Sequence, residues 1–206
     1  MASMLSKMSP TITNMIRMDH THVVAGFHQY QVDTPVRVKK GLADNICLAL
    51  EVHAQLEEEI FYPALGEVSP DETLEKAKPE HDRMRALIAQ LRALQPGEPA
   101  FDTTMFELMR TVLHHVADEE TQLLPKAERL LAGHLSDLGA RMTRRRLQLL
   151  GPRSGELAGS MARSVSTGTL LAAAGALAAA GGIMLARKST PNAPRGEWSN
   201  PTRWGH

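Results

Sequence analysis

The chain has 206 residues, in which 23 Lys and Arg residues balance 23 Asp and Glu residues. A neutral chain lacks the strong electrostatic field that would favour a nucleic acid or an acidic substrate as its partner. Its single cysteine, Cys47, excludes a disulfide within the chain and is typical of a reducing compartment. The first ten residues contain no apolar run of signal-peptide length, so we expect a cytoplasmic domain.

Leu, Met, Ala, Glu and Arg are frequent and aromatic residues make up only 4%, which favours an all-α fold. Four segments have apolar residues at helical spacing: residues 11–30, 35–62, 70–94 and a fourth segment that begins near Asp102. Pro79 lies inside the third segment, and we expect it to kink or divide that helix. The short connections predict an up-down-up-down four-helix bundle over residues 1–132.

The chain changes character after the bundle. Residues 133–163 begin with a basic helical stretch, whose arginines at 141–146 are expected on a solvated face, and end in the linker-like sequence GPRSGELAGS. Residues 164–186 form an uncharged run rich in Ala, Gly and Leu, which predicts an apolar helical tail. Residues 187–206 are polar and contain several prolines, which predicts disorder.

The uncharged run is long enough to cross a membrane. Its 23 residues would extend roughly 35 Å as a helix, and a hydrocarbon core is about 30 Å thick. The flanking basic residues are balanced, so charge does not decide the orientation of such a helix. Because no export signal is present, we expect a tail anchor that keeps the bundle on the cytoplasmic side. The alternatives are a soluble cytoplasmic chain whose Ala-rich helix docks on the bundle, or a flexible tether. Small residues at helical spacing would permit a homo-oligomer through the tail: Gly168, Ala172, Gly175, Ala179 and Gly182.

Parts of the predicted second and fourth helices match each other. When His53 and His115 are aligned, each has a glutamate four residues later (Glu57 and Glu119) and a proline ten residues later. Residues four apart lie on one helix face with Cβ atoms roughly 5–6 Å apart, so each pair can present a nitrogen and an oxygen to one point. The two pairs are therefore candidate metal ligands.

A lone histidine lies on the helix before each pair. His20 precedes its pair by 33 positions and His81 by 34, so the helix pair is in effect repeated around one pseudo-symmetric site. Two buried glutamates on facing helices would repel each other, and their desolvation would be costly, unless cations lay between them. Imidazole together with carboxylate suits iron, manganese or zinc.

The other polar residues near these motifs have plainer interpretations. Glu58, Glu59 and Glu120 are predicted to be solvated, because five or six residues after a histidine is the wrong helix face. Cys47 is predicted to be a small core residue. Four further histidines are assigned to the surface or to supporting roles: His22, His28, His114 and His134.

The order of the motifs resembles the hemerythrin-like, or HHE cation-binding, family. The resemblance covers roughly residues 11–130 and rests on Asp19-His20, HxxxE followed by proline, Glu80-His81, and HxxxEE followed by LLP. It implies a non-haem di-iron centre of two Fe²⁺/Fe³⁺ ions with an oxo bridge. The implied ligands are four terminal histidines and two bridging glutamates: His20, His53, His81, His115, Glu57 and Glu119.

One departure from the family pattern bears on function. Oxygen-carrying hemerythrins usually supply a fifth histidine from an HxxxH pair on the third helix, but Ala77 and Arg85 stand four residues either side of His81. The resemblance therefore implies a protein that binds or reacts with O₂, NO or peroxide, or that handles iron. A membrane-tethered interaction module with a purely structural metal remains an alternative, and a zinc or manganese hydrolase ranks last because no nucleophile stands near the site. No catalytic triad order or nucleic-acid motif is present, so no catalytic residue is assigned.

Overall fold

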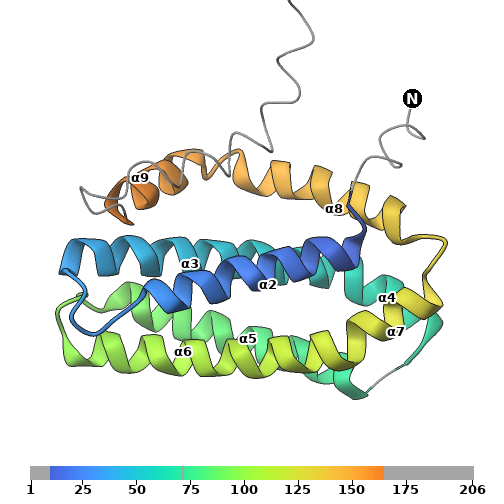
Figure 1. Ribbon diagram of the computed structural model, residues 1–206, viewed down its shortest axis with the longest axis horizontal. Helices are drawn as coiled ribbons and strands as arrows, with labels where there is room; N and C mark the ends of the chain where they lie inside the picture. Colours follow the sequence, from blue (N-terminus) through green and yellow to red (C-terminus); the bar gives the residue numbers. More distant parts are fainter. Residues whose placement is uncertain (1–9, 71, 165–206) are drawn as a thin grey trace, which may run out of the picture. The chain divides into compact units, whose positions relative to one another are not determined.

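The computed structural model describes residues 10–70 and 72–164, and all the regular structure in these ranges is helical. The four predicted segments form the bundle as α2 (Ile12–Gln29), α3 (Val36–Leu56), α5 (Glu72–Ala93) and α6 (Pro99–Asp118). Consecutive helices run in opposite directions (Figure 1). The prediction of an all-α fold is confirmed.

Local chemistry explains where the bundle helices begin and end. The Thr11 hydroxyl accepts a hydrogen bond from the backbone N–H of Asn14 and so caps α2. Pro35 immediately precedes α3, as the sequence predicted, because its fixed φ suits a helix start. Pro79 lies inside α5, yet that helix runs unbroken from Glu72 to Ala93, so the proline does not divide it.

Both helices that carry a His–Glu pair continue past it through a π-helical turn. The added elements are η1 (Glu57–Phe61) with α4 (Tyr62–Val68), and η2 (Glu119–Leu123) with α7 (Leu124–Leu130). In each turn a backbone N–H donates to the carbonyl five residues back, from Tyr62 to Glu57 and from Leu124 to Glu119. Such widened turns are frequent at functional sites, and here each one starts at a predicted ligand.

The prolines that follow the π turns account for this geometry. Pro63 and Pro125 have no N–H and cannot bond the carbonyl four residues back, so the helix must adjust around them. Each proline then lies in the first turn of the next helix, where the missing N–H costs little. The prediction that the second helix ends near Tyr62 is therefore wrong, since α4 extends it to Val68.

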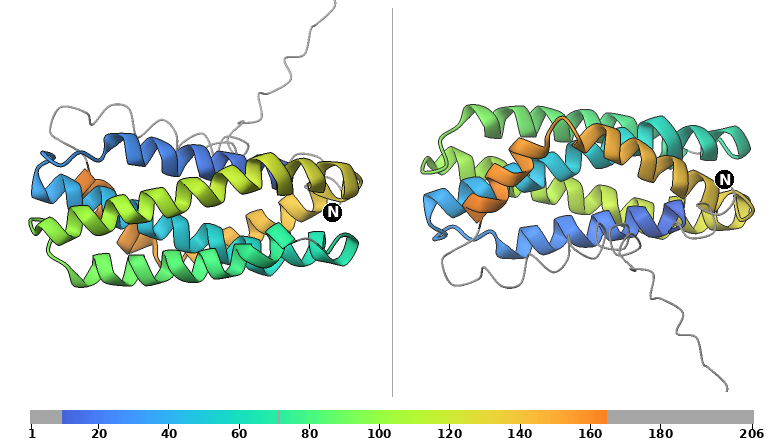
Figure 2. Two further views of the ribbon diagram at one scale, coloured as in Figure 1. Left: turned by 90° about the horizontal axis from the view of Figure 1, so that it is seen from below. Right: turned by 90° about the horizontal axis from the view of Figure 1, so that it is seen from above.

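Two further helices follow the bundle, α8 (Leu135–Leu150) and α9 (Ser154–Ser164). Helix α8 packs on α2 and α3, and α9 packs on α3 (Figures 1 and 2). The segment predicted as a linker is thus largely a helix. Glycine allows the close approach at both ends, because a Cβ at Gly139 would collide with the carbonyl oxygen of Pro10 and one at Gly41 would collide with the backbone of Ser164.

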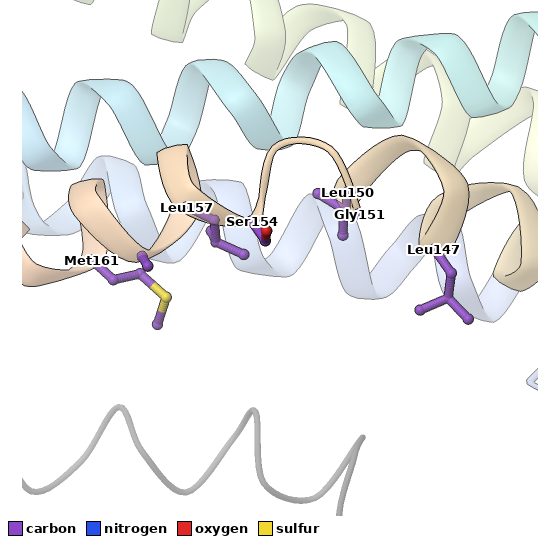
Figure 3. A pocket seen from close by; sticks show the side chains of 7 residues that line it. Leu147, Leu150, Gly151, Ser154, Leu157 and Met161 are labelled. Carbon is purple, nitrogen blue, oxygen red and sulfur yellow. The ribbon is translucent and has the colours of Figure 1, made fainter.

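An open apolar groove lies along α8 and α9 (Figure 3). It is lined mainly by aliphatic side chains: Leu147, Leu150, Gly151, Ser154, Leu157, Ala158 and Met161. Leu147 is 69% exposed. The predicted apolar tail begins at Ser164, the last residue of α9; its remainder and the predicted disordered segment lie outside the described residues. Among the described residues, no helix has the length and apolar character needed to span a membrane.

The buried apolar side chains form two clusters. One contains Ile16, Leu56, Phe61, Leu124 and Met142 among others, and the second contains Val23, Cys47, Leu50, Met84 and Val112 among others. The prediction that Cys47 is a core residue is confirmed. Along α2, α3, α5 and α6 the predicted ligands fall between residues of the two clusters, so a polar layer crosses the middle of the bundle.

Candidate metal centre

The six predicted ligands meet in one buried layer. Glu57, Glu119 and His81 have no exposed surface, and the other three histidines are at most 5% exposed: His20, His53 and His115. Each helix of the bundle places its residue on the inner face, and the two π turns begin at the glutamates. The sequence therefore identified every side chain of this layer except one, Tyr62.

The imidazole nitrogens named Nε2 point at the glutamates and at each other. His53 Nε2 lies 3.2 Å from Glu57 Oε2, and His20 Nε2 lies 3.1 Å from Glu119 Oε2. On the other side, His81 Nε2 lies 3.4 Å from Glu57 Oε2 and 3.1 Å from His115 Nε2. Donors that crowd together in this way have the chemistry of a cation site.

The donor atoms fall into two groups, each spanning at most 4.8 Å. One group is His20, His53, Glu57 and Glu119, and the other is Glu57, His81 and His115. Glu57 belongs to both groups, and Glu119 Oε2 also lies 3.6 Å from His115 Nε2. The two groups can thus hold two neighbouring cations with a glutamate between them.

Two atoms of the layer have no hydrogen-bond partner. His53 Nε2 and Glu57 Oε1 are buried and unsatisfied within the described part of the chain. Leaving a buried polar atom unpaired costs roughly 1–3 kcal/mol, and more for a charged group. A cation bound at this point would satisfy both atoms, so the residues present fit a metal.

The outer nitrogen of every histidine meets a carboxylate. The distances from Nδ1 to the carboxylate oxygen are 2.8 Å for His20–Glu120, 3.4 Å for His53–Asp19, 3.0 Å for His81–Glu58 and 2.7 Å for His115–Glu80. An ionised carboxylate only accepts, so Nδ1–H donates and Nε2 is the nitrogen that faces the centre, where it can bind a cation once it carries no proton. Metal-binding histidines are usually held in this way.

The prediction that Glu58 and Glu120 are solvated is wrong. Their side chains are only 25% and 31% exposed, and each accepts from a histidine of the opposite helix pair. A helical repeat relates each glutamate only to the histidine on its own helix. It therefore does not reveal the histidine partners on other helices. Two features of the sequence could have indicated these supporting carboxylates. One is the second glutamate of each EE pair, and the other is the acidic residue immediately before His20 and before His81. Glu59 is exposed and pairs with Arg145, as expected for a surface residue.

Arginines neutralise three of the four outer carboxylates. Arg85 binds Glu58 at 2.9 Å, Arg17 binds Glu120 at 3.1 Å, and Arg146 binds Asp19 at 2.9 Å. The arginines at 141–146 are therefore not simply a solvated face. Glu80 forms no ion pair with an arginine in the described part of the chain, and its neighbours there are His114 and Asp118.

Tyr62 completes the buried layer and was not predicted. Its hydroxyl lies 2.9 Å from Glu119 Oε1, 3.2 Å from Glu57 Oε2 and 3.3 Å from His81 Nε2. Burial and the charges of the two glutamates raise the pKa of Tyr62 well above its usual value, so the hydroxyl keeps its proton. The signal was weak, because the matching position of the second pair is Leu124.

Without a metal, protons offset the negative charge of the layer. Burial and the charge of Glu119 raise the pKa of Glu57 to about 8. Burial opposes the charged form of Glu119 as well, but the hydrogen bond from His20 and the nearby histidines lower its pKa to about 2. Burial also disfavours charged His20, yet its contacts with Glu119 raise the pKa of His20 to about 9. A metal has to displace these protons.

A cavity of ≈10 Å³ lies beside the layer. Polar side chains line one side, and apolar residues line the rest: Val23, Leu50, Met84, Val112 and Val116. This volume is about that of one water probe. The centre can therefore admit only very small molecules without movement of the helices.

Comparisons with known proteins agree with this geometry. The family model described as "Hemerythrin HHE cation binding domain" matches residues 11–127. A DNA nickase of Nostoc sp. is 29% identical over 117 residues, which are 57% of this chain and 33% of that protein, so the match spans about a third of the relative. The uncharacterized protein Rv2633c of Mycobacterium tuberculosis is 27% identical over 143 residues, 67% of this chain and 86% of the other.

A solved structure shares the fold. It is the crystal structure of an HHE cation binding domain-containing protein, an Rv2633c homolog from Mycobacterium kansasii. The TM-score is 0.62 at 20% identity, over 76% of this chain and 99% of that one. The motif order, the fold and a family match over more than half of its length show that the chain belongs to the hemerythrin HHE cation-binding family.

Proposed function

We propose that the layer is a non-haem di-iron centre. Two donor groups share Glu57, and two buried atoms of the layer lack a hydrogen-bond partner among the described residues; this single arrangement carries the proposal. His20 and His53 would bind one iron, and His81 and His115 the other. Glu57 and Glu119 would bridge them. Mixed imidazole and carboxylate donors suit iron, although manganese and zinc accept the same atoms.

We further propose that the centre binds or reduces a small molecule such as O₂, NO or peroxide. When bound, a di-iron centre supplies electrons and open coordination positions. The residues around it supply selection, because the cavity beside the layer is very small and mostly apolar. Tyr62 supplies a hydroxyl proton at the two glutamates. The closed site argues against a hydrolase, whose substrates would be larger. Iron storage or delivery uses the same ligands and remains an outcome of the test.

The test is reconstitution with ferrous iron under argon. We expect about two irons per chain after desalting, and a change in the visible absorption when the protein meets its reactive partner among O₂, NO and peroxide. A folded protein that retains no iron would contradict the proposal. If all three reagents leave the spectrum unchanged while iron remains bound, chelation separates two outcomes: a bundle that unfolds has a structural metal, and a bundle that stays folded stores or delivers iron.

We also propose that residues 164–186 anchor the chain to a membrane, with the bundle on the cytoplasmic side. The support for this proposal is the length and lack of charge of residues 164–186. Full-length protein in a detergent-free lysate should sediment with the membranes and should be released by detergent. A version that ends after Ser164 should stay in the supernatant. Full-length protein that remains in the supernatant after high-speed centrifugation would favour the alternative of a soluble cytoplasmic protein.

A further inference from the structure

A helix outside the family region reaches the metal centre. Arg146 of α8 donates from its two terminal guanidinium nitrogens to the two oxygens of Asp19, with one N···O distance of 2.9 Å. The same Asp19 carboxylate accepts from His53 Nδ1. Two hydrogen-bonded contacts therefore connect α8 to a predicted ligand, whereas the family match ends at residue 127.

The other outer carboxylates show what this arginine does. Glu58 and Glu120 receive the same support from Arg85 and Arg17, which lie on helices of the family domain. For Asp19, by contrast, the described part of the chain offers no arginine partner other than Arg146. Helix α8 thus supplies the arginine that pairs with Asp19, whereas the arginines that pair with Glu58 and Glu120 come from the bundle helices.

The position of Arg146 is set by how α8 packs. Leu138 and Met142 on the same helix are buried in the core cluster that also contains Ile12 and Ile16 of α2. Gly139 allows the helix to approach Pro10 closely. Figure 2 shows α8 lying across the bundle over α3. The guanidinium is therefore brought to Asp19 by a packed helix and not by a free surface side chain.

We propose that Arg146 is a positioning residue of the metal centre, and that docking of α8 and binding of metal stabilise each other through Asp19 and His53. When Arg146 binds Asp19, the Asp19 carboxylate orients the His53 ring with its Nε2 toward the metal. In turn, a bound metal fixes His53 and, through it, the Asp19 carboxylate that Arg146 binds. This coupling is reciprocal: the free energy by which α8 docking favours metal binding equals the free energy by which metal binding favours α8 docking. The inference rests on the proposed metal function.

Arg145 provides a matched control. It is the neighbouring residue of α8 and also pairs with a glutamate, but that glutamate is Glu59, whose hydrogen bonds among the described residues go to Arg145 and Gln55 and not to a histidine. Arg146→Gln should weaken Co²⁺ binding by about 10-fold, in the range found for residues that hold a ligand. Arg145→Gln should bind Co²⁺ as the unaltered protein does, and Arg146→Lys should recover part of the loss.

Amide hydrogen exchange measures the reverse effect, that of bound metal on the docking of α8. In the unaltered full-length protein, Co²⁺ should slow exchange of the α8 amides by about 10-fold. Arg146→Gln should abolish that slowing, and Arg145→Gln should keep it. If metal leaves α8 exchange unchanged in the unaltered protein, or if Arg146→Gln keeps full affinity, the inference is wrong while the metal site stands. If the unaltered protein binds no metal, the proposed function itself fails.

A double-mutant cycle covers the case in which Arg146→Gln loosens the fold. If Arg146 acts through Asp19, the double variant Asp19→Asn/Arg146→Gln should bind Co²⁺ about as well as Asp19→Asn alone. Losses in affinity that simply add would mean that Arg146 acts elsewhere, and they would overturn the proposal.

Discussion

The helix pairs α2–α3 and α5–α6 carry the same ligand pattern but have different surroundings. The first pair is covered by α8 and α9, and its Val52 and Leu56 are buried in the core. The matching positions of the second pair are His114 and Asp118, which lie beside Glu80 at the surface. One copy of the repeat thus forms a docking face for extra helices, whereas the other presents polar side chains at the matching positions.

The difference continues inside the layer. In the first pair the pKa of Glu57 and that of His20 are raised, and in the second pair the pKa of Glu119 and that of His81 are lowered. Tyr62 also follows the first pair, where Leu124 follows the second. A shared ligand pattern therefore does not give the two helix pairs the same surroundings. Four experiments would test how far the two helix pairs differ in their contribution to metal binding.

Removal of a glutamate that we propose as a bridge should have the largest effect. Glu57→Ala and Glu119→Ala should each lose most of the bound iron, because a carboxylate that neutralises the cations is gone. Glu57→Ala should lose at least as much as Glu119→Ala, since Glu57 belongs to both donor groups. Iron is counted after anaerobic reconstitution and desalting. Glu59→Ala, a surface change on the same helical turn, is the control. Full iron occupancy in both variants would exclude the bridging role.

The protons of the first pair should make metal binding strongly dependent on pH. Below pH 8, Glu57 and His20 both hold a proton that the metal must displace, because their pKa values are raised to about 8 and about 9. Affinity for Co²⁺ should therefore fall as the pH falls, by at least about 100-fold between pH 9 and pH 6.5, and should level off above pH 9. A competition titration with a chelator measures it. An affinity that is constant over this range would show that the layer holds no such protons.

The outer carboxylates should come next. Glu80→Gln and Asp19→Asn each loosen one histidine, and the expected loss of affinity is about 10–100-fold. Glu80→Gln should have the larger effect, because its contact with His115 is 2.7 Å and that of Asp19 with His53 is 3.4 Å. Both affinities follow from the same Co²⁺ titration. The reverse order would mean that Arg146 makes Asp19 the more important support.

Tyr62→Phe should have the smallest effect and should test the asymmetry directly. Loss of its hydrogen bond to a buried carboxylate should destabilise the metal-free protein by about 1–3 kcal/mol, while iron is retained at the same stoichiometry. Thermal unfolding reports the first effect, and iron analysis after desalting reports the second. The visible spectrum of the iron-loaded protein should change in Tyr62→Phe, because the hydroxyl contacts both glutamates. Tyr30→Phe is the matched control, since Tyr30 donates to Asp102 away from the layer. If Tyr30→Phe alters the spectrum of the iron-loaded protein as much as Tyr62→Phe does, Tyr62 has no special place at the centre.

The bundle and the six candidate ligands of its polar layer followed from local patterns in the sequence. Helical spacing and turn residues are local, so the four helices were found with ends shifted by a few residues. A histidine and a glutamate four apart must share a face, so the pairs that begin at His53 and His115 were found as well. The π turns were missed, although Pro63 and Pro125 stood in the sequence, because nothing in the local pattern says how a helix adjusts to a proline.

The residues that support the candidate ligands could be found only from the folded arrangement of the helices. Glu58 reaches His81, Glu120 reaches His20, and Arg146 reaches Asp19. Each of these contacts joins different helices that are far apart in the chain, and a helical repeat describes only the faces of one helix at a time. The docking of α8 and α9 was hidden for the same reason. Their apolar residues show that they must pack, but the partner surface on α2 and α3 exists only once those helices have folded.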